Sequence, residues 1–168
     1  VTALLVSSRN TVWAGSRKGL ASFKDNVWTI YTAGGKLFGL PVTDILERPD
    51  GAIWAATPAG IFTYDLDHQW NVLTTEHGLP DNNIVCLEQG ANGREVWVGT
   101  MRGLGLLHDG RRETYTTEDG LPDNDITALE LDSYGTLWIG TPRGPAALSR
   151  GDIAVPAPGN PLAGQYVK

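Results

Sequence analysis

The sequence predicts an all-β protein built from about four repeated units of about 41 residues, each with four short strands. Tryptophans recur at spacings of 41, 43 and 41 residues, and a glycine follows each of them by six residues. The tryptophans are Trp13, Trp54, Trp97 and Trp138, and the glycines are Gly19, Gly60, Gly103 and Gly144. No stretch keeps the 3.6-residue apolar period of an amphipathic helix, and 21 glycines with 10 prolines argue against long helices.

The third unit illustrates the pattern of one repeat. An apolar strand, IVCL (84–87), is followed by a turn, QGANGRE (89–95), and by the tryptophan strand VWVGT (96–100). A glycine turn then leads to a third strand, LGLLHD (104–109), and to a fourth, RRETYTT (111–117). The Asn-Gly dipeptide supplies the positive-φ positions of a tight hairpin turn. Each unit is therefore expected to form four antiparallel strands joined by short turns.

Four antiparallel strands in 40–45 residues correspond to one blade of a β-propeller. We therefore predict an all-β propeller of about four four-stranded antiparallel blades, either complete in itself or part of a larger ring. The blades are expected at about residues 1–41, 42–83, 84–125 and 126–155, followed by a Pro-rich tail or linker at 156–168. The aligned tryptophan is expected to pack each blade against its neighbour.

Composition excludes several classes of function. The net charge of −6 and the pI near 4.9 argue against a nucleic-acid protein held by phosphate contacts and against a binder of anionic membranes. No apolar run approaches the ~20 residues of a membrane span, so we expect no membrane contact by this segment. No signal peptide is recognisable. The single cysteine, Cys86, excludes an internal disulfide and a cysteine-rich zinc site.

No group of residues points to catalysis. His68, His77 and His108 occupy positions that the repeat explains, and no two of them share a metal-ligand spacing. Cys86 aligns with strand residues and is expected to be a buried, inert thiol. The repeated-turn carboxylates, such as Asp123, are expected to be turn and cap residues. We therefore predict that the chain is not an enzyme and has no catalytic residue, metal or cofactor.

Two segments resemble the two-component regulator propeller repeat: TLWIGTPRG (136–144) and YTTEDGLPDND (115–125). The linker TTEHGLPDNNI (74–84) is nearly identical to the second segment, and the resemblance extends over about residues 1–150. In that family such blades commonly build large propellers on the sensory side of hybrid histidine kinases, where they bind ligands that include carbohydrate fragments. The resemblance therefore suggests a periplasmic or extracellular location. This chain differs in having four units, and no kinase, receiver or transmembrane part.

Three assemblies are compatible with four blades. They are a small closed four-bladed ring, an eight-bladed homodimer that shares one ring, and a fragment completed by another chain. Blade faces that remain open must be covered. We expect the shared ring or the fragment, because the chain starts at Val1 within a strand and because the family's rings are usually larger.

One face of the propeller is the expected binding surface. The linker into each first strand and the turn between the second and third strands open on the same face, because propeller strands alternate in direction. The polar residues gathered there are Arg17, Lys18, Asp81, Asn82, Arg102, Asp123, Asn124 and Arg143. Arginine, carboxylate and amide groups together suit a polar ligand or a peptide. The alternative is that the acids and bases neutralise one another on a solvated rim.

The sequence thus predicts a non-catalytic ligand-sensing propeller module of a signalling protein. Its expected partner is a polar small molecule or oligosaccharide, with no role for nucleic acid. The alternative function is a protein–protein interaction scaffold, or a propeller fragment, that binds a partner protein chain. A lyase or hydrolase is the weakest reading, because no acid/base pair or metal site is recognisable. The signalling role comes from the resemblance and not from site chemistry.

Overall fold

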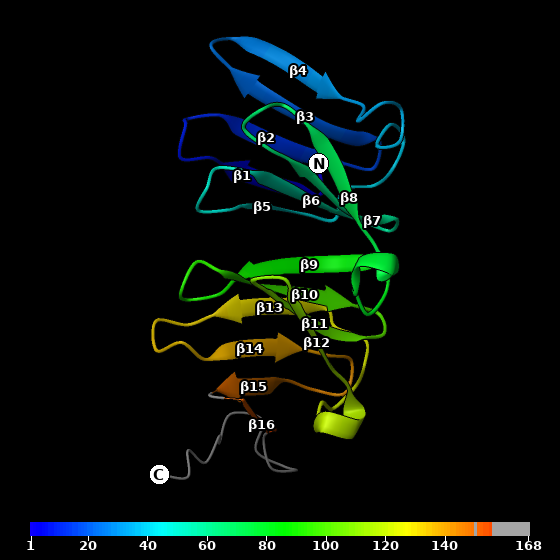
Figure 1. Ribbon diagram of the computed structural model, residues 1–168, viewed down its shortest axis with the longest axis vertical. Coiled ribbons are helices and arrows are strands. Elements are labelled where there is room, and N and C mark those ends of the chain that lie inside the picture. The colour runs from blue at the N-terminus through cyan, green and yellow to red at the C-terminus, as the bar shows by residue number, and fades with distance from the viewer. Residues whose placement is uncertain (150, 156–168) are drawn as a thin grey trace.

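The computed structural model describes residues 1–149 and 151–155 (Figure 1). These residues form four separate four-stranded antiparallel sheets, which confirms the prediction of an all-β fold of four propeller blades. The predicted tail at 156–168 lies outside the described residues. Within the described part of the chain, no helix is long and apolar enough to cross a membrane.

Each blade is a meander in which strands that are neighbours in sequence pair with one another. Blade 1 contains β1 (Ala3–Val6), β2 (Val12–Ser16), β3 (Gly19–Lys24) and β4 (Val27–Tyr31). Blade 2 contains β5 (Asp44–Glu47), β6 (Ile53–Thr57), β7 (Gly60–Tyr64) and β8 (Trp70–Leu73). Blade 3 contains β9 (Ile84–Gln89), β10 (Glu95–Thr100), β11 (Gly103–His108) and β12 (Arg111–Tyr115). Blade 4 contains β13 (Ala128–Leu131), β14 (Leu137–Gly140), β15 (Ala146–Ser149) and β16 (Asp152–Ala154). Two 3₁₀ helices, η1 (Thr75–His77) and η2 (Thr117–Asp119), lie in the linkers.

A hydroxyl side chain fixes the turn between the second and third strands of each blade. The Thr100 hydroxyl donates to the carbonyl oxygen of Gly103 at 2.7 Å, and the Thr57 hydroxyl donates to that of Gly60 at 2.8 Å. Gly103 has a φ of 131°, and a Cβ there would lie 2.7 Å from the Tyr115 carbonyl oxygen. Only glycine accepts this backbone and this contact, which explains the constant spacing from tryptophan to glycine.

The linkers after blades 2 and 3 are closed by equivalent side chains. The backbone N–H of Thr116 donates to the Asp119 carboxylate at 2.8 Å. At the same place before η1, the backbone N–H of Thr74 donates to Nδ1 of His77 at 3.2 Å. His77 therefore has the structural role that the repeat predicts, as a ring nitrogen in place of a carboxylate.

Successive blades pack face to face. We call the face that a blade turns towards the next blade its rear face, and the opposite one its front face. On the rear face of blade 1, Trp13 is buried among Ile45 and Phe62 of the front face of blade 2. Trp97 is buried in the same way between blades 3 and 4, whereas Trp138 on the rear face of blade 4 is 39% exposed. The predicted packing role of the tryptophans is thus confirmed wherever a described blade follows.

The four blades form an open row. They follow one another in chain order along the long axis, with blade 1 at one end and blade 4 at the other (Figure 1). The first strands of neighbouring blades make contact in the order β1, β5, β9 and β13. The described residues therefore do not form the small closed four-bladed ring, one of the three assemblies considered above. The front face of blade 1 and the rear face of blade 4 are the two ends of the row.

Candidate functional site

The linkers with η1 and η2 emerge on one side of the row of blades, opposite the hairpins that join β1 to β2 and β13 to β14 (Figure 1). On this linker face the predicted charged residues pair with one another. Arg102 Nε lies 3.3 Å from Asp81 Oδ2, and Arg143 Nε lies 3.2 Å from Asp123 Oδ2. Each pair joins the linker that enters a blade to the turn between the second and third strands of the same blade. Pairing of acids with bases was the alternative to a binding surface.

The side chains of the two predicted asparagines accept hydrogen bonds from the backbone. Asn82 Oδ1 accepts from the N–H of Thr75 at 2.8 Å, and Asn124 Oδ1 accepts from the N–H of Thr117 at 2.8 Å. These bonds fix the path of each linker into its 3₁₀ helix. Asp123 Oδ1 also accepts a hydrogen bond from the backbone N–H of Asp125 at 3.2 Å. This bond agrees with the turn role that the sequence predicts for Asp123.

Arg17 and Lys18 lie apart from these pairs, in the turn between β2 and β3 of blade 1. The backbone of Lys18 bonds Ser16 Oγ at 3.1 Å and Gly39 N at 3.1 Å. Within the described residues no ion pair joins either side chain to an acid. The eight predicted residues thus fall into one group on each of blades 1, 3 and 4. Ligand binding by them stays a prediction.

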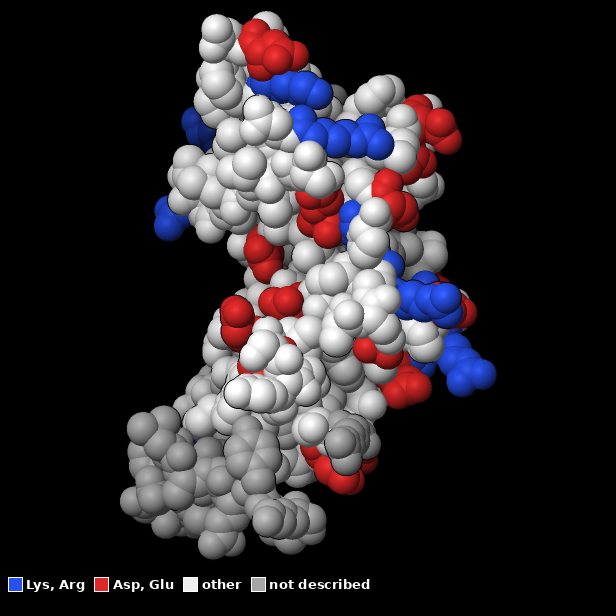
Figure 2. Space-filling model, turned by 90° about the vertical axis from the view of Figure 1, so that its left-hand side faces the viewer, with Lys and Arg blue, Asp and Glu red and all other residues white. Residues whose placement is uncertain are grey.

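The opposite, hairpin side of the molecule faces the viewer in Figure 2, where acidic and basic side chains are interspersed over the blades. No large field of a single sign is visible in this view. A highly charged ligand therefore has no extended complementary surface on the side shown.

Aromatic side chains of blades 1 and 2 converge between the two blades. Trp13 stacks on Tyr31 with ring centroids 5.0 Å apart, and Tyr64 lies 5.2 Å from Tyr31 and 4.8 Å from Trp70. The imidazole of His68 completes the group, 5.5 Å from the Tyr64 ring. We call the space lined by these five rings the blade 1–2 groove.

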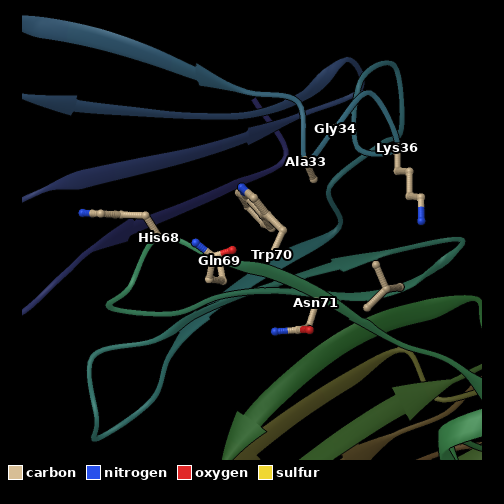
Figure 3. Close-up of a pocket in the computed structure, with 8 residues that line it drawn as sticks. Ala33, Gly34, Lys36, His68, Gln69, Trp70 and Asn71 are labelled. Atoms are coloured by element: carbon tan, nitrogen blue, oxygen red, sulfur yellow. The ribbon is translucent and has the colours of Figure 1, made fainter.

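Two cavities flank this group of rings. One, of about 290 Å³, is lined by Trp13, Tyr31 and Tyr64 together with hydroxyl and charged side chains. Those polar residues are Ser7, Arg9, Thr11, Ser22, Lys24, Thr29, Glu47 and Asp65. The other, of about 640 Å³, lies beside β8 and is lined by Trp70 and by the first linker (Figure 3). His68 lines both cavities.

The loop between β7 and β8 positions His68. Five residues separate the paired residues Tyr64 and Trp70, whereas four separate the equivalent pair Phe23 and Trp28 of blade 1. His68 adopts a φ of 62°, a left-handed conformation that is uncommon for a residue other than glycine. Its Nδ1 lies 2.6 Å from the Tyr64 hydroxyl.

Hydrogen bonds within the loop hold this geometry. Asp65 Oδ1 accepts from the N–H groups of Asp67 at 3.0 Å and Gln69 at 2.8 Å. Burial raises the pKa of Tyr64, and the neighbouring Tyr31 and Asp65 raise that pKa further. The Tyr64 hydroxyl therefore stays protonated at neutral pH and can donate a hydrogen bond.

The equivalent space between blades 2 and 3 is filled by a side chain. The Arg48 guanidinium carbon lies 5.3 Å from the centroid of the Trp54 ring. The same guanidinium donates to Gln89 Oε1 at 2.7 Å and to the carbonyl oxygens of Arg94 and Glu95 at 3.3 Å. This arginine connects the two blades and occupies the place that a ligand would need.

The equivalent space between blades 3 and 4 is a smaller and mostly apolar cavity of about 250 Å³. Leu106, Leu131 and Leu148 stand there in place of Ser22, Glu47 and Tyr64. Among the three spaces between described blades, only the blade 1–2 groove combines an open cavity, several aromatic rings and many polar groups. The lining of a binding site usually has this composition.

The groups that could perform covalent chemistry are engaged or unreactive. Burial, and then the nearby Asp44 charge, raise the pKa of the Cys86 thiol to about 12, which agrees with the inert thiol expected from the sequence. His77 is bound to Thr74, and His108 Nε2 lies 3.4 Å from Asp109. In the described residues no three His, Cys, Asp or Glu side chains are placed to hold a metal ion together.

The sequence interpretation missed the blade 1–2 groove. Its aromatic residues occupy strand positions that every blade fills with bulky side chains, so they were indistinguishable from the core. Two signals were present: the extra residue between Tyr64 and Trp70, and a histidine in that longer loop. Departures from a repeat are places where function is expected.

Residues 78–102 and 120–143 match the family described as two component regulator propeller. Each match runs from a linker through the tryptophan strand into the following turn. These two segments are two-component regulator propeller repeats. No curated protein sequence matches the chain significantly.

Solved structures share this propeller fold. The extracellular domain of the hybrid two component system BT3049 from B. thetaiotaomicron matches with a TM-score of 0.76 and 24% identity, over 86% of this chain and 21% of that one. The corresponding domain of BT4673 matches with a TM-score of 0.73 and 18% identity, over 88% and 23%. Virginiamycin B lyase from Staphylococcus aureus matches with a TM-score of 0.71 and 19% identity, over 94% and 56%.

This chain therefore spans only about a fifth of the two extracellular domains and a little over half of the lyase. At these identities the likeness establishes the fold alone. Neighbours with the same fold include a lyase, so the fold is compatible with both binding and catalysis.

Proposed function

We propose that this regulator propeller chain is a non-catalytic, ligand-binding module of a sensory protein. Its ligand is a polar ring compound, such as a short oligosaccharide, that lies in the blade 1–2 groove. The observation that carries the proposal is the convergence of five ring side chains from two blades beside hydroxyl and charged groups. The sensory role is supported by the repeat family and by the likeness in fold to extracellular domains of two component systems.

The chemistry of the groove suits a sugar. Aromatic rings offer flat apolar surfaces to the C–H faces of a pyranose, while the Tyr64 hydroxyl and the His68 imidazole offer hydrogen bonds at its edge. Side chains with few rotatable bonds, such as Tyr and Trp, lose little entropy when a ligand binds. A cavity of about 290 Å³ is the size of one sugar ring with part of a second.

The non-catalytic part of the proposal is supported by the state of the reactive groups. The Cys86 thiol, with its raised pKa of about 12, is not ionised at neutral pH. His68 is the one histidine at the groove, and its Nδ1 is occupied by the Tyr64 hydroxyl. The two carboxylates that line the cavity are engaged, since Glu47 accepts from the N–H and the hydroxyl of Ser8, and Asp65 accepts from two backbone N–H groups of its own loop. These engaged groups favour recognition over bond cleavage.

Isothermal titration calorimetry tests this function. The chain is titrated with a neutral β-glucan hexasaccharide, a mannan fragment and a uronic-acid disaccharide. We expect saturable binding of at least one of them, with no change in the sugar recovered afterwards. His68→Ala should weaken that binding by about tenfold, because the removed imidazole is exposed and its loss spares the core.

A matched variant exists in the smaller cavity between blades 3 and 4, where Tyr115 occupies the position of Tyr31. Tyr115→Phe should leave the affinity unchanged. The absence of saturable binding up to about 5 mM for all three sugars would refute the proposed ligand class. Binding that His68→Ala leaves intact would refute the proposed groove.

A further inference from the structure

The two linkers that contain 3₁₀ helices cover the outermost strand of the blade that follows them. The linker with η1 touches β12 of blade 3, since a Cβ at Gly78 would lie 2.8 Å from Arg112 Cγ. Arg112 Nε also donates to the His77 carbonyl oxygen at 3.2 Å. The linker with η2 touches β16 of blade 4 in the same way, since a Cβ at Gly120 would lie 3.8 Å from Ile153 Cβ. Blades 3 and 4 therefore have little space between linker and outer strand.

Blade 2 lacks this cover. Trp70 of β8 is equivalent to Arg112 of β12 and Ile153 of β16, since the three pair with equivalent residues of the third strand. The linker into blade 2 is described throughout and forms no 3₁₀ helix, and a Cβ at its Gly34 would meet nothing within 4 Å. Between this linker and β8 lies the cavity of about 640 Å³ (Figure 3).

This cavity follows the outer edge of β8. Four consecutive residues, from Gln69 to Val72, line it, and β8 is the last strand of its sheet. The N–H of Asp65 on the β7 side donates to the Gln69 carbonyl oxygen at 3.2 Å, so this pair is a bonded position of the ladder. Bonded and free positions alternate along antiparallel strands. The N–H and C=O groups of Trp70 and Val72 therefore face away from β7, towards the open edge.

The edge of β8 also lacks the charges that commonly protect exposed strand edges. The outer strand β12 contains Arg111, Arg112 and Glu113, and β16 begins at Asp152. The sequence of β8 is WNVL, without a charged residue. Its edge therefore offers backbone groups that can pair with another strand and carries no charge that would repel one.

We propose that the cavity beside β8 binds an extended peptide segment, which pairs with β8 as a fifth strand of blade 2. Antiparallel pairing opposite Trp70 and Val72 forms four backbone hydrogen bonds. Side chains at alternate positions of the segment then enter the cavity between β8 and the linker. This site does not rest on the proposed sugar site, because His68 is the one described residue that lines both cavities.

The charge of the cavity selects the peptide. Among the described residues that line it, Lys36 carries the one permanent charge, and no acid is present. Within the described part of the chain no ion pair joins Lys36 to a carboxylate. The segment that fits this cavity therefore carries an acidic side chain, which pairs with Lys36, among uncharged residues that favour an extended backbone.

Peptide display tests the site. The chain is panned with a phage-displayed library of random dodecapeptides, and the most enriched sequence is synthesised with a fluorescent label. We expect an acidic residue in that sequence and micromolar binding by fluorescence anisotropy. Two further versions of the peptide carry methyl groups on alternate backbone nitrogens, one at even and one at odd positions. One of them should bind at least about tenfold more weakly than the other, because only one set of N–H groups faces β8.

Val72→Pro removes one of the outward N–H groups of β8. Proline is tolerated where the N–H of an edge strand faces away from the sheet, so blade 2 should stay folded by circular dichroism. We expect peptide binding to weaken at least about tenfold. Thr114→Pro is the matched control, because Thr114 has the position of Val72 on β12. It should leave the affinity unchanged.

Lys36→Glu gives a test that does not depend on the strand, because Lys36 is an exposed residue of the linker. It should weaken binding of the acidic peptide at least about threefold, and it carries the test if Val72→Pro does not fold. Three results would overturn the peptide site: no enriched sequence, equal binding of the two methylated peptides, and binding that neither variant on the blade 2 side weakens.

Discussion

Nδ1 of His68 lies 2.6 Å from the Tyr64 hydroxyl, and this bond joins the β7–β8 loop of blade 2 to the aromatic group between blades 1 and 2. The loop backbone at His68 is left-handed, with a φ of 62°, so the bond offsets a conformation that the chain would otherwise avoid. The imidazole is thereby fixed where both flanking cavities meet. A ligand in either cavity would contact the same ring.

Tyr64→Phe removes the hydroxyl and leaves the ring in place. We expect a loss of about 0.5–1 kcal/mol in the free energy of unfolding, because one exposed hydrogen bond disappears. Urea denaturation followed by circular dichroism measures it. His68→Ala should cost a similar amount, and the double variant should cost less than the sum of the two, because both remove the same bond. Additive losses would mean that the two groups do not interact.

The sequence was sufficient to predict the blades because the signals that define them are local. The spacing from Trp97 to Gly103 follows from one turn with a required positive φ, and each such turn is visible in the residues that form it. The blade 1–2 groove depends on contacts between residues of different blades, such as Tyr31 with Tyr64. No local pattern distinguishes a ring that borders a cavity from one that fills the core.

The linker face shows a second limit of the sequence. Residue types alone suggested a polar binding surface, but Asp81 and Arg102 face each other at 3.3 Å. The first hairpin of the blade separates these two residues in the sequence. That they meet as an ion pair is visible only in three dimensions. The same charges that indicate a binding surface also neutralise one another.

Arg48→Met tests the contact that fills the space between blades 2 and 3. The variant keeps an apolar side chain but loses the cation–π contact with Trp54 and the hydrogen bonds to Gln89 and Glu95. We expect a loss of about 1–3 kcal/mol in the free energy of unfolding, measured in urea. Arg94→Met is the control, since its ion pair with Asp109 is at the surface and should contribute under about 1 kcal/mol. Equal effects would contradict the bridging role of Arg48.

Arg102→Ala and Arg143→Ala separate the two candidate binding surfaces. Both arginines are about four-fifths exposed, so each variant should change the free energy of unfolding by less than about 1 kcal/mol. If the ligand occupies the blade 1–2 groove, the calorimetric affinity should also stay unchanged. A clear loss of affinity with unchanged stability would instead place binding on the linker face.

Asp44 predicts a specific dependence of stability on pH. Burial raises the pKa of its carboxyl group, and hydrogen bonds from the N–H groups of Leu87 and Ile45 oppose that rise only in part. A raised pKa in the folded state favours the protonated form, so its contribution is fully present below about pH 4 and is lost as the pH rises through the folded pKa. Relative to Asp44→Asn, the unmodified chain should therefore lose stability as the pH rises above about 4 and through the folded-state pKa. A difference that is constant with pH would contradict the raised pKa.

Cys86 should be chemically silent in the folded chain. Burial and the nearby Asp44 charge raise the pKa of its thiol to about 12. At pH 8, therefore, only about one molecule in ten thousand carries the thiolate. We expect a thiol-reactive disulfide reagent to modify the folded chain at least about 100-fold more slowly than the urea-unfolded chain, in which the thiol has an ordinary pKa. Absorbance of the released reagent at pH 8 gives both rates.

Because Cys86 lies on β9, where blades 2, 3 and 4 meet, its reaction also reports opening of this part of the row. Rapid labelling of the folded chain, at a rate that follows thiolate concentration and not unfolding, would show that the thiol is exposed and ionised.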